Sequence, residues 1–305
     1  MAIPTSRAKE KAEIRINEEL CTGCSLCVEV CSDFGLVIAD GKARPGNTAV
    51  FGCVACGHCM AVCPEGAIEI HGRTMSPADL FDLPPKENAS DYNQMLALLQ
   101  RRRSIREFEN RPVEREKIDR ILKAAVTAPM GLPPSDVNVL VLDSMEKNRA
   151  FVKDFCEFLE TIKWLVSDWF MTLMRPFWGK ANNEMFRDFI KPCLDIFISR
   201  MKKGENVVTY DAPLVMYFYG SPYTDPADPI VAATYAMIAG ESLGLGTCML
   251  GAIHPFIAYG KRARRFREKY GIKYVSREGL FVIFGYPSVR YKKGILRTFA
   301  SVTSN

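Results

Sequence analysis

Residues 21–31 read CTGCSLCVEVC, and residues 53–64 read CVACGHCMAVCP. Both runs follow the pattern C-x2-C-x2-C-x3-C, which is the spacing of bacterial 4Fe–4S sites. Three thiolates separated by two residues each wrap a loop around one corner of an iron–sulfur cube. The fourth thiolate follows one helical turn later and reaches the neighbouring cube.

The doubled pattern therefore predicts two crossed sets of cluster ligands. Small residues at Gly23 and Gly57 let backbone N–H groups approach the sulfides. Zinc is the alternative, because four cysteines also bind zinc, but zinc sites normally use two C-x2-C pairs. We favour two 4Fe–4S clusters. The first set is Cys21, Cys24, Cys27 and Cys63, and the second set is Cys53, Cys56, Cys59 and Cys31.

The composition of the chain limits the class of protein. With 305 residues, 48% of them hydrophobic and 25% charged, it has room for two domains and for a real core. A disulfide-rich secreted scaffold is disfavoured, because eight of the 11 cysteines cluster in one region behind a polar N-terminus. No apolar run reaches the roughly 18 residues of a membrane span. We therefore expect a cytoplasmic protein that has no membrane-spanning helix.

Charge separates the two parts of the chain. Residues 1–75 carry seven Lys/Arg and nine Asp/Glu, a net charge of −2, which leaves 33 and 26 of the chain's 40 and 35 for the remainder, a net charge of +7. A proline-marked connector follows residue 75. We predict a two-cluster domain with its linker at residues 1–85, called the head below, and a second domain at residues 86–305, called the body.

The body mixes helices and strands, which predicts an α+β fold with a mixed sheet and flanking helices. Asp91 is expected to cap the first helix. Residues 151–203 are rich in aromatic residues and methionine, and we predict a helical insertion there, which serves as core, as a subunit interface or as a cover over an active site. The expected strands are residues 137–142, 214–219 and 280–284, and the other helices are residues 112–128, 227–243 and 261–270.

Four arginines crowd the end of the first body helix, at 101–103 and 106. Such a run is a solvated face, a nucleic-acid stripe or an anion site for a cofactor phosphate. The net charge of +5 is too mild to favour nucleic acid. A dinucleotide fingerprint is absent, because GLGTCMLG at residues 244–251 has the wrong glycine spacing and is placed at the end of a helix.

Four segments in order carry a resemblance. They are RRSIREF at residues 102–108, AAVTAP at 124–129, LGLGTCMLG at 243–251, and FGYP at 284–287 followed by basic residues. The body resembles the nitroreductase family of FMN-dependent oxidoreductases. The head resembles two-cluster bacterial ferredoxins over residues 14–71, although Ser32 replaces the proline that usually follows the fourth cysteine.

The resemblance implies a homodimer with FMN at the subunit interface. Arg106 would lie near the flavin N1/O2 edge, where positive charge stabilises the reduced flavin. The segment at Pro129, Met130 and Gly131 would come from the partner subunit. Because MGLPPSD at residues 130–136 lacks the amide side chains usual there, its contacts with the flavin would come from the backbone. The remaining implied contacts are Arg102, Arg103 and Ser104 for the phosphate and ribityl chain, Leu250 and Gly251 for the flavin N5, and Lys292, Lys293 or Arg297 for the phosphate.

The two parts together predict an iron–sulfur flavoprotein oxidoreductase. Electrons would pass through the two clusters to FMN, which reduces a small nitro, quinone or enone-like acceptor. Because the chemistry is on the flavin, no side chain is assigned as catalytic. The donor is either reduced ferredoxin, or another redox protein, or NADH or NADPH. The alternatives are a non-enzymatic electron-transfer flavoprotein or redox-partner module and, more remotely, a zinc-containing nucleic-acid binder; we expect no nucleic-acid partner.

Overall fold

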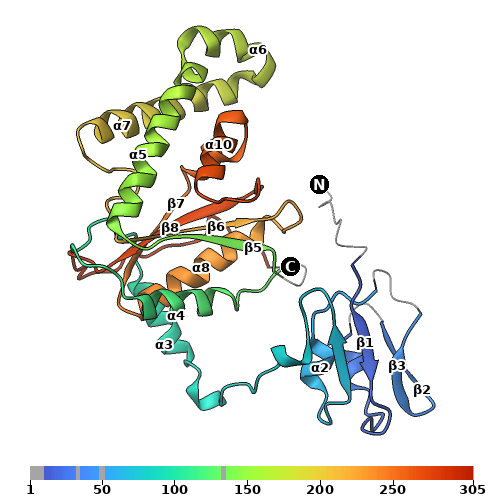
Figure 1. Cartoon of the computed structure of the whole chain (residues 1–305). Helices are drawn as coiled ribbons and strands as arrows, with labels where there is room; N and C mark the ends of the chain where they lie inside the picture. The colour runs from blue at the N-terminus through green and yellow to red at the C-terminus, as the bar shows by residue number, and fades with distance from the viewer. Residues whose placement is uncertain (1–9, 32–34, 48–51, 132–134, 305) are drawn as a thin grey trace. The chain divides into compact units, whose positions relative to one another are not determined.

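A computed structural model describes residues 10–31, 35–47, 52–131 and 135–304 (Figure 1). Ser32 lies outside the described residues. The chain divides into two compact units. The first unit is Met1–Ser90 together with Pro129–Asn138 and Gly220–Asp228, and the second unit is Asp91–Ala128, Val139–Tyr219 and Pro229–Asn305.

The head consists of two similar halves. The element order is β1 (Glu13–Ile16), α1 (Leu26–Glu29) and β2 (Leu36–Ala39), followed by β3 (Lys42–Pro45), α2 (His58–Val62) and β4 (Ile68–His71). Each half therefore carries one cysteine run, and the third cysteine of each run lies in a short helix. The outer strands β1 and β4 pair antiparallel, with Glu13 opposite His71, and β2 pairs antiparallel with β3.

The hairpin between β2 and β3 turns through Asp40 and Gly41, whose φ angles are 50° and 71°. Two consecutive positive φ angles are the conformation of a type I′ turn, and Asp-Gly is a preferred sequence for it. Buried side chains such as Leu36, Met60 and Ile70 fill the space between the strands and the two short helices.

Two 3₁₀ helices, η2 (Pro77–Asp79) and η3 (Lys86–Asn88), lie in the predicted connector. The next helix, α3 (Tyr92–Arg101), begins with a capping box, in which the Asp91 side chain accepts from the Gln94 N–H at 2.8 Å and Gln94 reaches back to the Asp91 N–H. The predicted cap at Asp91 is therefore confirmed.

The body is built on a four-stranded sheet with the order β5-β6-β8-β7. Strands β6 (Leu214–Gly220) and β8 (Gly279–Gly285) lie in the middle and are buried along their whole length. They pair antiparallel, with Leu214 opposite Phe284, and β8 pairs antiparallel with β7 (Gly246–Leu250). The predicted strands are confirmed, including β5 (Val137–Leu142).

Strand β7 corrects the sequence analysis, which placed residues 244–251 at the end of a helix. Helix α8 (Ala227–Ser242) ends before Gly244, whose φ of 78° reverses the chain, and residues 246–250 then form a strand against β8. Pairing with β8 stabilises this segment as a strand, although its glycine and small residues give no strong strand signal.

Helices cover both faces of the sheet (Figure 1). On one face, a core cluster joins the sheet residues Tyr217 and Phe281 to Phe151 and Phe155 of α5 (Met145–Ile162) and Phe266 of α10 (Lys261–Lys269). The other face packs on α8, where Gly240 lies against the Phe284 ring. The body also contains α4 (Arg115–Ala125), α7 (Lys191–Lys202) and α9 (His254–Ala258).

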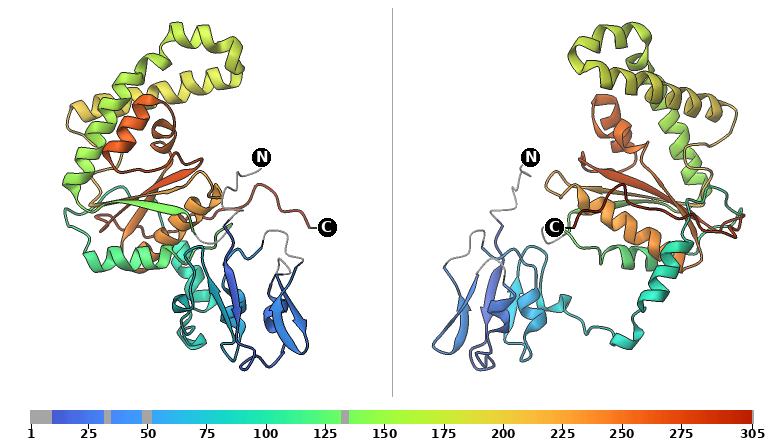
Figure 2. Two further views of the ribbon diagram at one scale, coloured as in Figure 1. Left: turned by 45° about the vertical axis from the view of Figure 1, so that its right-hand side comes forward. Right: turned by 180° about the vertical axis from the view of Figure 1, so that it is seen from behind.

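The aromatic segment at residues 151–203 is helical, as predicted, but its parts differ in burial. After α5 and η4 (Lys163–Val166) come α6 (Asp168–Met185), a π-helical turn η5 (Phe186–Ile190) and α7. Helix α5 belongs to the core. Helix α7 packs back toward α5, with Leu194 and Ile198 buried in the same core cluster. Helix α6 extends away from the sheet (Figure 2), and its Trp169 and Phe177 are 63% and 79% exposed.

Candidate cofactor sites

The two cysteine loops of the head share one backbone conformation. In each run, the second and fourth residues after the first cysteine have positive φ. They are Gly23 (72°) and Ser25 (66°) in the first run, and Ala55 (58°) and Gly57 (75°) in the second. Alternation between right- and left-handed residues turns successive backbone N–H groups toward one side, which suits the sulfides of an anionic cluster. The sequence repeat is thus also a structural repeat.

Gly23 is required by a close approach as well as by its φ angle. A Cβ atom at this position would lie 2.1 Å from the carbonyl oxygen of Gly41, in the β2–β3 turn. The hairpin therefore packs directly on the first cysteine loop. The ammonium group of Lys42, one residue further on, also donates to the carbonyl oxygen of Cys21.

The structure brings the first predicted ligand set together. Cys21, Cys24, Cys27 and Cys63 line one pocket, whose apolar walls include Ile38 and Ile68. Cys63 comes from the second run, so the ligands lie crosswise, as the spacing requires. Cys24 is exposed, whereas Cys21 and Cys27 are buried.

The second set is grouped in the same way. Burial, followed by the neighbouring sulfurs of Cys53, Cys56 and Cys31, raises the pKa of the Cys59 thiol to about 12. The pKa of Cys53 is also raised by burial and then by Cys56 and Cys31. Cys31 of the first run therefore lies with the three cysteines of the second. Because metals bind thiolates, loading of this set must release protons.

Backbone N–H groups contact two of the sulfurs. The Ala43 N–H donates to Cys21 Sγ at 3.4 Å, and the Ala67 N–H donates to Cys63 Sγ at 3.3 Å. The Ala43 contact is the largest cause that lowers the pKa of Cys21. Such N–H···S contacts tune the reduction potential of a bound cluster.

The donor set fits 4Fe–4S clusters. Each set offers four cysteines, three from one run and one from the other, which is the ligation that bacterial two-cluster sites use. In the part of the chain that the structure describes, no three His, Cys, Asp or Glu side chains are arranged to hold a single metal ion.

In the body, the arginine run lies along the free edge of β7. Ser104 pairs in parallel with Thr247, and the Ile105 N–H donates to the Thr247 carbonyl oxygen at 3.0 Å. Further on, Phe108 pairs antiparallel with Pro287. A Cβ atom at Gly246 would lie 2.8 Å from the Ile105 side chain, so glycine allows this approach. Three of the four segments that suggested a flavin site are thus adjacent.

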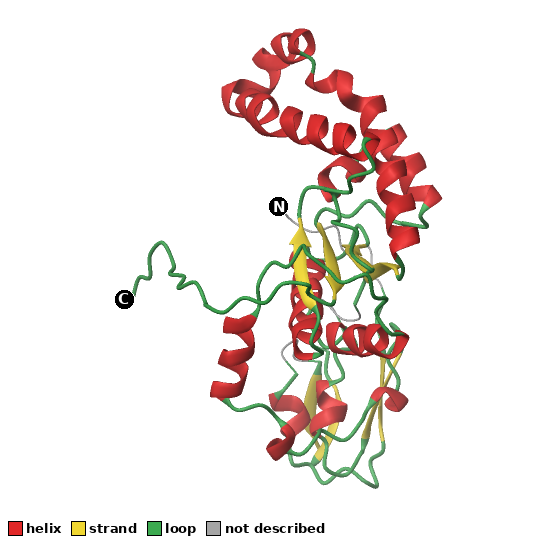
Figure 3. Cartoon of the chain, turned by 90° about the vertical axis from the view of Figure 1, so that its left-hand side faces the viewer, coloured by secondary structure: helices red, strands yellow, loops and turns green. Residues whose placement is uncertain are grey.

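The arginines have different surroundings. Arg102 and Arg101 lie near Glu241 of α8, whose pKa is raised by burial although the two guanidinium groups act to lower it. Arg103 lies beside the C-terminal tail, because a Cβ atom at Gly294 would be 3.2 Å from its Nη2. The tail forms no helix or strand over residues 289–304 (Figure 3). Its predicted phosphate ligands Lys292, Lys293 and Arg297 are all exposed, within three residues of Gly294.

The end of β7 is open. Leu250 is half-buried and Gly251 is exposed, and a Cβ atom at Gly251 would meet nothing within 4 Å. Arg106 is also exposed, and its guanidinium lies 5.6 Å from the centre of the Tyr210 ring. The Gly251 backbone and the Arg106 side chain are therefore both accessible.

Sequence reasoning missed two side chains here. Thr247 is fully buried, and its Oγ1 has no hydrogen-bond partner among the described residues; its only sequence signal is its place within GLGTCMLG. Tyr210 has no motif around it at all.

Comparison with known proteins identifies both parts. The body matches the nitroreductase family over residues 99–286, and the head matches a 4Fe-4S dicluster domain over residues 13–64. The chain belongs to the nitroreductase family. This confirms the predicted α+β fold and the FMN-dependent oxidoreductase class, fused to a ferredoxin-like domain.

Three solved structures similar to the chain are nitroreductases, two described with bound FMN and one described as FMN-dependent. The nitroreductase with bound FMN from Bacteroides fragilis has a TM-score of 0.48 and 16% identity, covering 70% of this chain and all of its own. The nitroreductase from Desulfitobacterium hafniense, also with bound FMN, has a TM-score of 0.46 and 19% identity. The match covers 69% of this chain and 97% of that chain. An FMN-dependent nitroreductase from Clostridium difficile has a TM-score of 0.45 and 16% identity. The match covers 70% of this chain and 100% of that chain. No curated protein matches the chain.

The remaining predicted flavin contacts of this nitroreductase lie in its first compact unit, whereas the arginine run belongs to the second. Pro129 and Gly131 are exposed and Met130 is half-buried. The Gly131 N–H donates to Asp228 Oδ1 at 2.9 Å, and burial raises the pKa of that carboxyl group. Residues 132–134 lie outside the described residues. Among the helices that the structure describes, none is both long and apolar enough to cross a membrane.

Proposed function

We propose that this nitroreductase takes electrons through two 4Fe–4S clusters in its head and delivers them to FMN in its body. The acceptor is a small nitro, quinone or enone-like compound, which gains two electrons and two protons while the donor is oxidised. The observation that carries the proposal is the crosswise grouping of the head cysteines, with Cys63 beside the first run and Cys31 beside the second.

In the head, the two cysteine sets hold the clusters, and the N–H groups of Ala43 and Ala67 contact sulfurs of the first set. The domain boundary proposed from the sequence, between residues 85 and 86, follows the proline-rich connector. Cys24 is the exposed ligand of the first set, so this cluster has the shorter path to an external donor such as reduced ferredoxin.

In the body, bound FMN supplies electron exchange in steps of one or two electrons. Arg102, Arg103 and Ser104 hold its phosphate and ribityl chain, and a basic residue of the exposed tail near Gly294 adds a further cation. The open end of β7 leaves space for the ring system.

Arg106 supplies positive charge to the pyrimidine edge of the flavin, and the backbone of Leu250 and Gly251 faces its N5. In the proposed homodimer, Pro129, Met130 and Gly131 of one protomer complete the site of its partner.

The test begins with an anaerobic sample of the full chain. We expect about eight iron atoms, eight sulfides and one FMN per chain. Reduced ferredoxin, NADH and NADPH are then compared as reductants in stopped-flow absorbance. Reduction of the flavin by ferredoxin, lost when Cys59 is replaced by alanine and kept in a Cys193→Ala control, supports the route. A zinc-loaded sample contradicts it, as does flavin reduction by a nicotinamide at a rate unchanged by Cys59→Ala.

A further inference from the structure

The loop that leads into β6 holds two strained residues. Tyr210 and Asp211 have φ angles of 55° and 51°, a left-handed conformation that side chains with a Cβ atom rarely adopt. Two consecutive non-glycine residues in this region persist only where the surrounding structure holds them there. Such strain is concentrated at functional sites.

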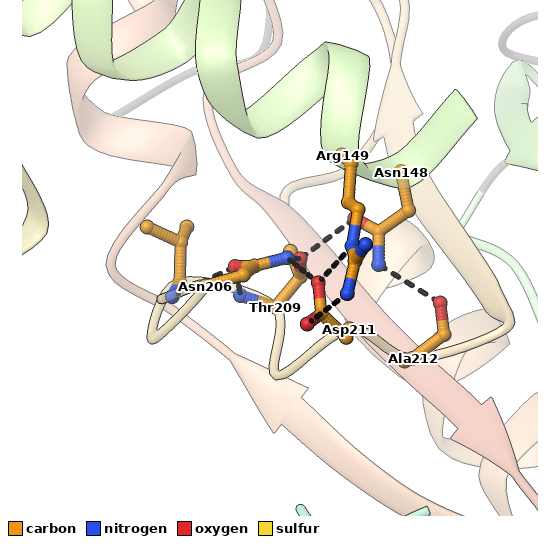
Figure 4. A network of polar contacts seen from close by, with 7 residues as sticks. Asn148, Arg149, Asn206, Thr209, Asp211 and Ala212 are labelled. Atoms are coloured by element: carbon orange, nitrogen blue, oxygen red, sulfur yellow. Dashed lines mark hydrogen bonds and ion pairs between the residues drawn. The ribbon is translucent and has the colours of Figure 1, made fainter. Parts of the chain in front are cut away.

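A buried polar network holds this loop (Figure 4). Thr209 Oγ1 donates to Asn148 Oδ1 at 2.6 Å, and Asn148 Nδ2 donates to the Ala212 carbonyl oxygen at 2.8 Å. Asn206 Nδ2 donates to Thr209 Oγ1 at 2.8 Å and to Asp211 Oδ1 at 3.1 Å. Asn148 and Thr209 are both fully buried. The strained loop is thereby tied to the first turn of α5.

An ion pair closes the network on its exposed side. Arg149 contacts Asp211 through two hydrogen bonds, from Nε at 2.9 Å and from Nη2 at 2.8 Å. A paired guanidinium of this geometry is among the stronger polar contacts in proteins. The contacts of Asp211 with Arg149 and Asn206 fix the residue that directly follows Tyr210.

The side chain that this loop presents is the Tyr210 ring. The ring packs against the core cluster of the body, and the Arg106 guanidinium lies 5.6 Å from its centre. Within the described residues, no carboxylate forms an ion pair with the Arg106 guanidinium; the Glu107 carboxylate accepts from the Arg106 backbone N–H at 3.2 Å instead. A cation over an aromatic face is attracted by the ring electrons, so Tyr210 restrains Arg106 and leaves its charge free for a ligand.

We propose that Tyr210 is a positioning residue, which holds the Arg106 guanidinium ready for the flavin, and that the network of Asn148, Asn206, Thr209 and Asp211 maintains Tyr210 in that place. This inference rests on the proposed function, because it assumes that the arginine run binds FMN. It differs from a purely structural role for Tyr210, in which the ring fills space and Arg106 is independent of it.

A double-mutant cycle separates the two roles. Full-length protein with its clusters intact is freed of FMN by dialysis, and the dissociation constant of added FMN is measured by quenching of flavin fluorescence. A cation–π contact at this exposure is equivalent to about a two- to fivefold change in affinity. We expect Tyr210→Leu to raise the dissociation constant by this factor, and Tyr210→Phe, which keeps the ring, to leave it unchanged.

The decisive comparison is made in the Arg106→Gln background, where Tyr210→Leu should have no further effect. The midpoint potential of bound flavin gives a second readout, which should become more negative in Tyr210→Leu and Arg106→Gln alike. If Tyr210→Leu does not fold, Tyr210→Met, which keeps more of the buried volume, replaces it. If Tyr210→Leu raises the dissociation constant of FMN by the same factor in both backgrounds, the inference about Tyr210 is wrong, while the proposed function still stands. A wild-type protein that binds no FMN overturns the proposed function and this inference with it.

Discussion

The head and the body build their candidate sites in opposite ways. In the head, three of the four cysteines in each set come from one loop of seven residues, and the loop conformation repeats at Gly23 and Ala55. In the body, the run at residues 102–108 meets β7 and the C-terminal tail only through the fold. A site whose ligands come mainly from one loop can be predicted from the sequence motif. A site that forms through strand pairing depends on many distant residues and is harder to predict.

The largest expected effect breaks the head by removing one ligand. Cys59→Ala takes away a buried member of the second set, so the second 4Fe–4S cluster is lost and the iron content falls toward four per chain. Iron and sulfide analysis with low-temperature EPR measures this. Cys193→Ala, outside both sets, is the matched control and should keep all the iron. Equal iron in the two variants would contradict the ligand assignment.

A second substitution tests whether the first cysteine loop of the head depends on the close approach of Gly23 to the Gly41 carbonyl oxygen. Gly23→Ala places a Cβ atom 2.1 Å from the Gly41 oxygen, and we expect about 2–4 kcal/mol of destabilisation with loss of the first cluster. The control is Gly66→Ala, which has a φ of 60° but open space around it. It should cost only about 1 kcal/mol. Thermal unfolding monitored by the cluster absorbance compares them, and equal melting temperatures would show that the Gly41 contact is unimportant.

A third prediction uses pH to distinguish the body from the head. Burial lowers the pKa of His254, whose Nδ1 is bonded to the Tyr217 hydroxyl at 2.8 Å. The unfolded chain therefore binds a proton at higher pH than the folded one. Neutral His254 therefore contributes fully to the stability of the folded state above about pH 6.5. This contribution is lost as the pH falls from there toward the lower pKa of His254 in the folded state.

We expect wild-type protein to lose about 1 kcal/mol between pH 7.5 and 5.5 from this source, measured as a drop in the unfolding temperature of the body. His254→Gln should flatten that part of the profile. The control His58→Gln alters an exposed histidine of the head and should keep the wild-type slope. Parallel profiles for all three proteins would show that His254 does not titrate in this range.

The smallest expected effect lies inside the candidate flavin site. Thr247→Val removes a buried hydroxyl without a partner among the described residues, so stability should be unchanged or should rise by up to about 1 kcal/mol. Thr209→Val removes an equally buried hydroxyl that is bonded to Asn148 at 2.6 Å, and it should cost about 1–3 kcal/mol. Denaturant titration of the two variants measures the contrast; a similar loss in both would mean that Thr247 has a partner after all.

The head could be predicted from the sequence more completely than the body. Cysteine spacing predicted the grouping of Cys63 with the first run, because the doubled C-x2-C-x2-C-x3-C pattern is specific for crossed ligation of two clusters. The helix cap at Asp91 was predictable from the residue type before an apolar helical pattern. Both predictions rest on short sequence patterns rather than on the register of distant strands.

What the sequence did not reveal depends on long-range pairing. Strand β7 pairs with β8 along its length, and residues 246–250, Gly-Thr-Cys-Met-Leu, show no alternation of apolar and polar residues that would predict a strand. The left-handed backbone at Tyr210 is held by side chains of α5 some 60 residues earlier in the chain. Neither the register of β7 nor a strained loop has a local pattern that sequence periodicity can detect.

The position of the arginine run has a consequence for the solubility of the protein. An edge strand with free N–H and C=O groups is a template for pairing with other chains, and residues 104–105 cover part of the edge of β7 by backbone pairing. The same segment that carries the candidate phosphate ligands also shields the sheet from aggregation. Charge-removing substitutions at Arg102 or Arg103 leave this shield in place, whereas a proline at position 105 would remove the N–H that bonds Thr247 and expose the edge.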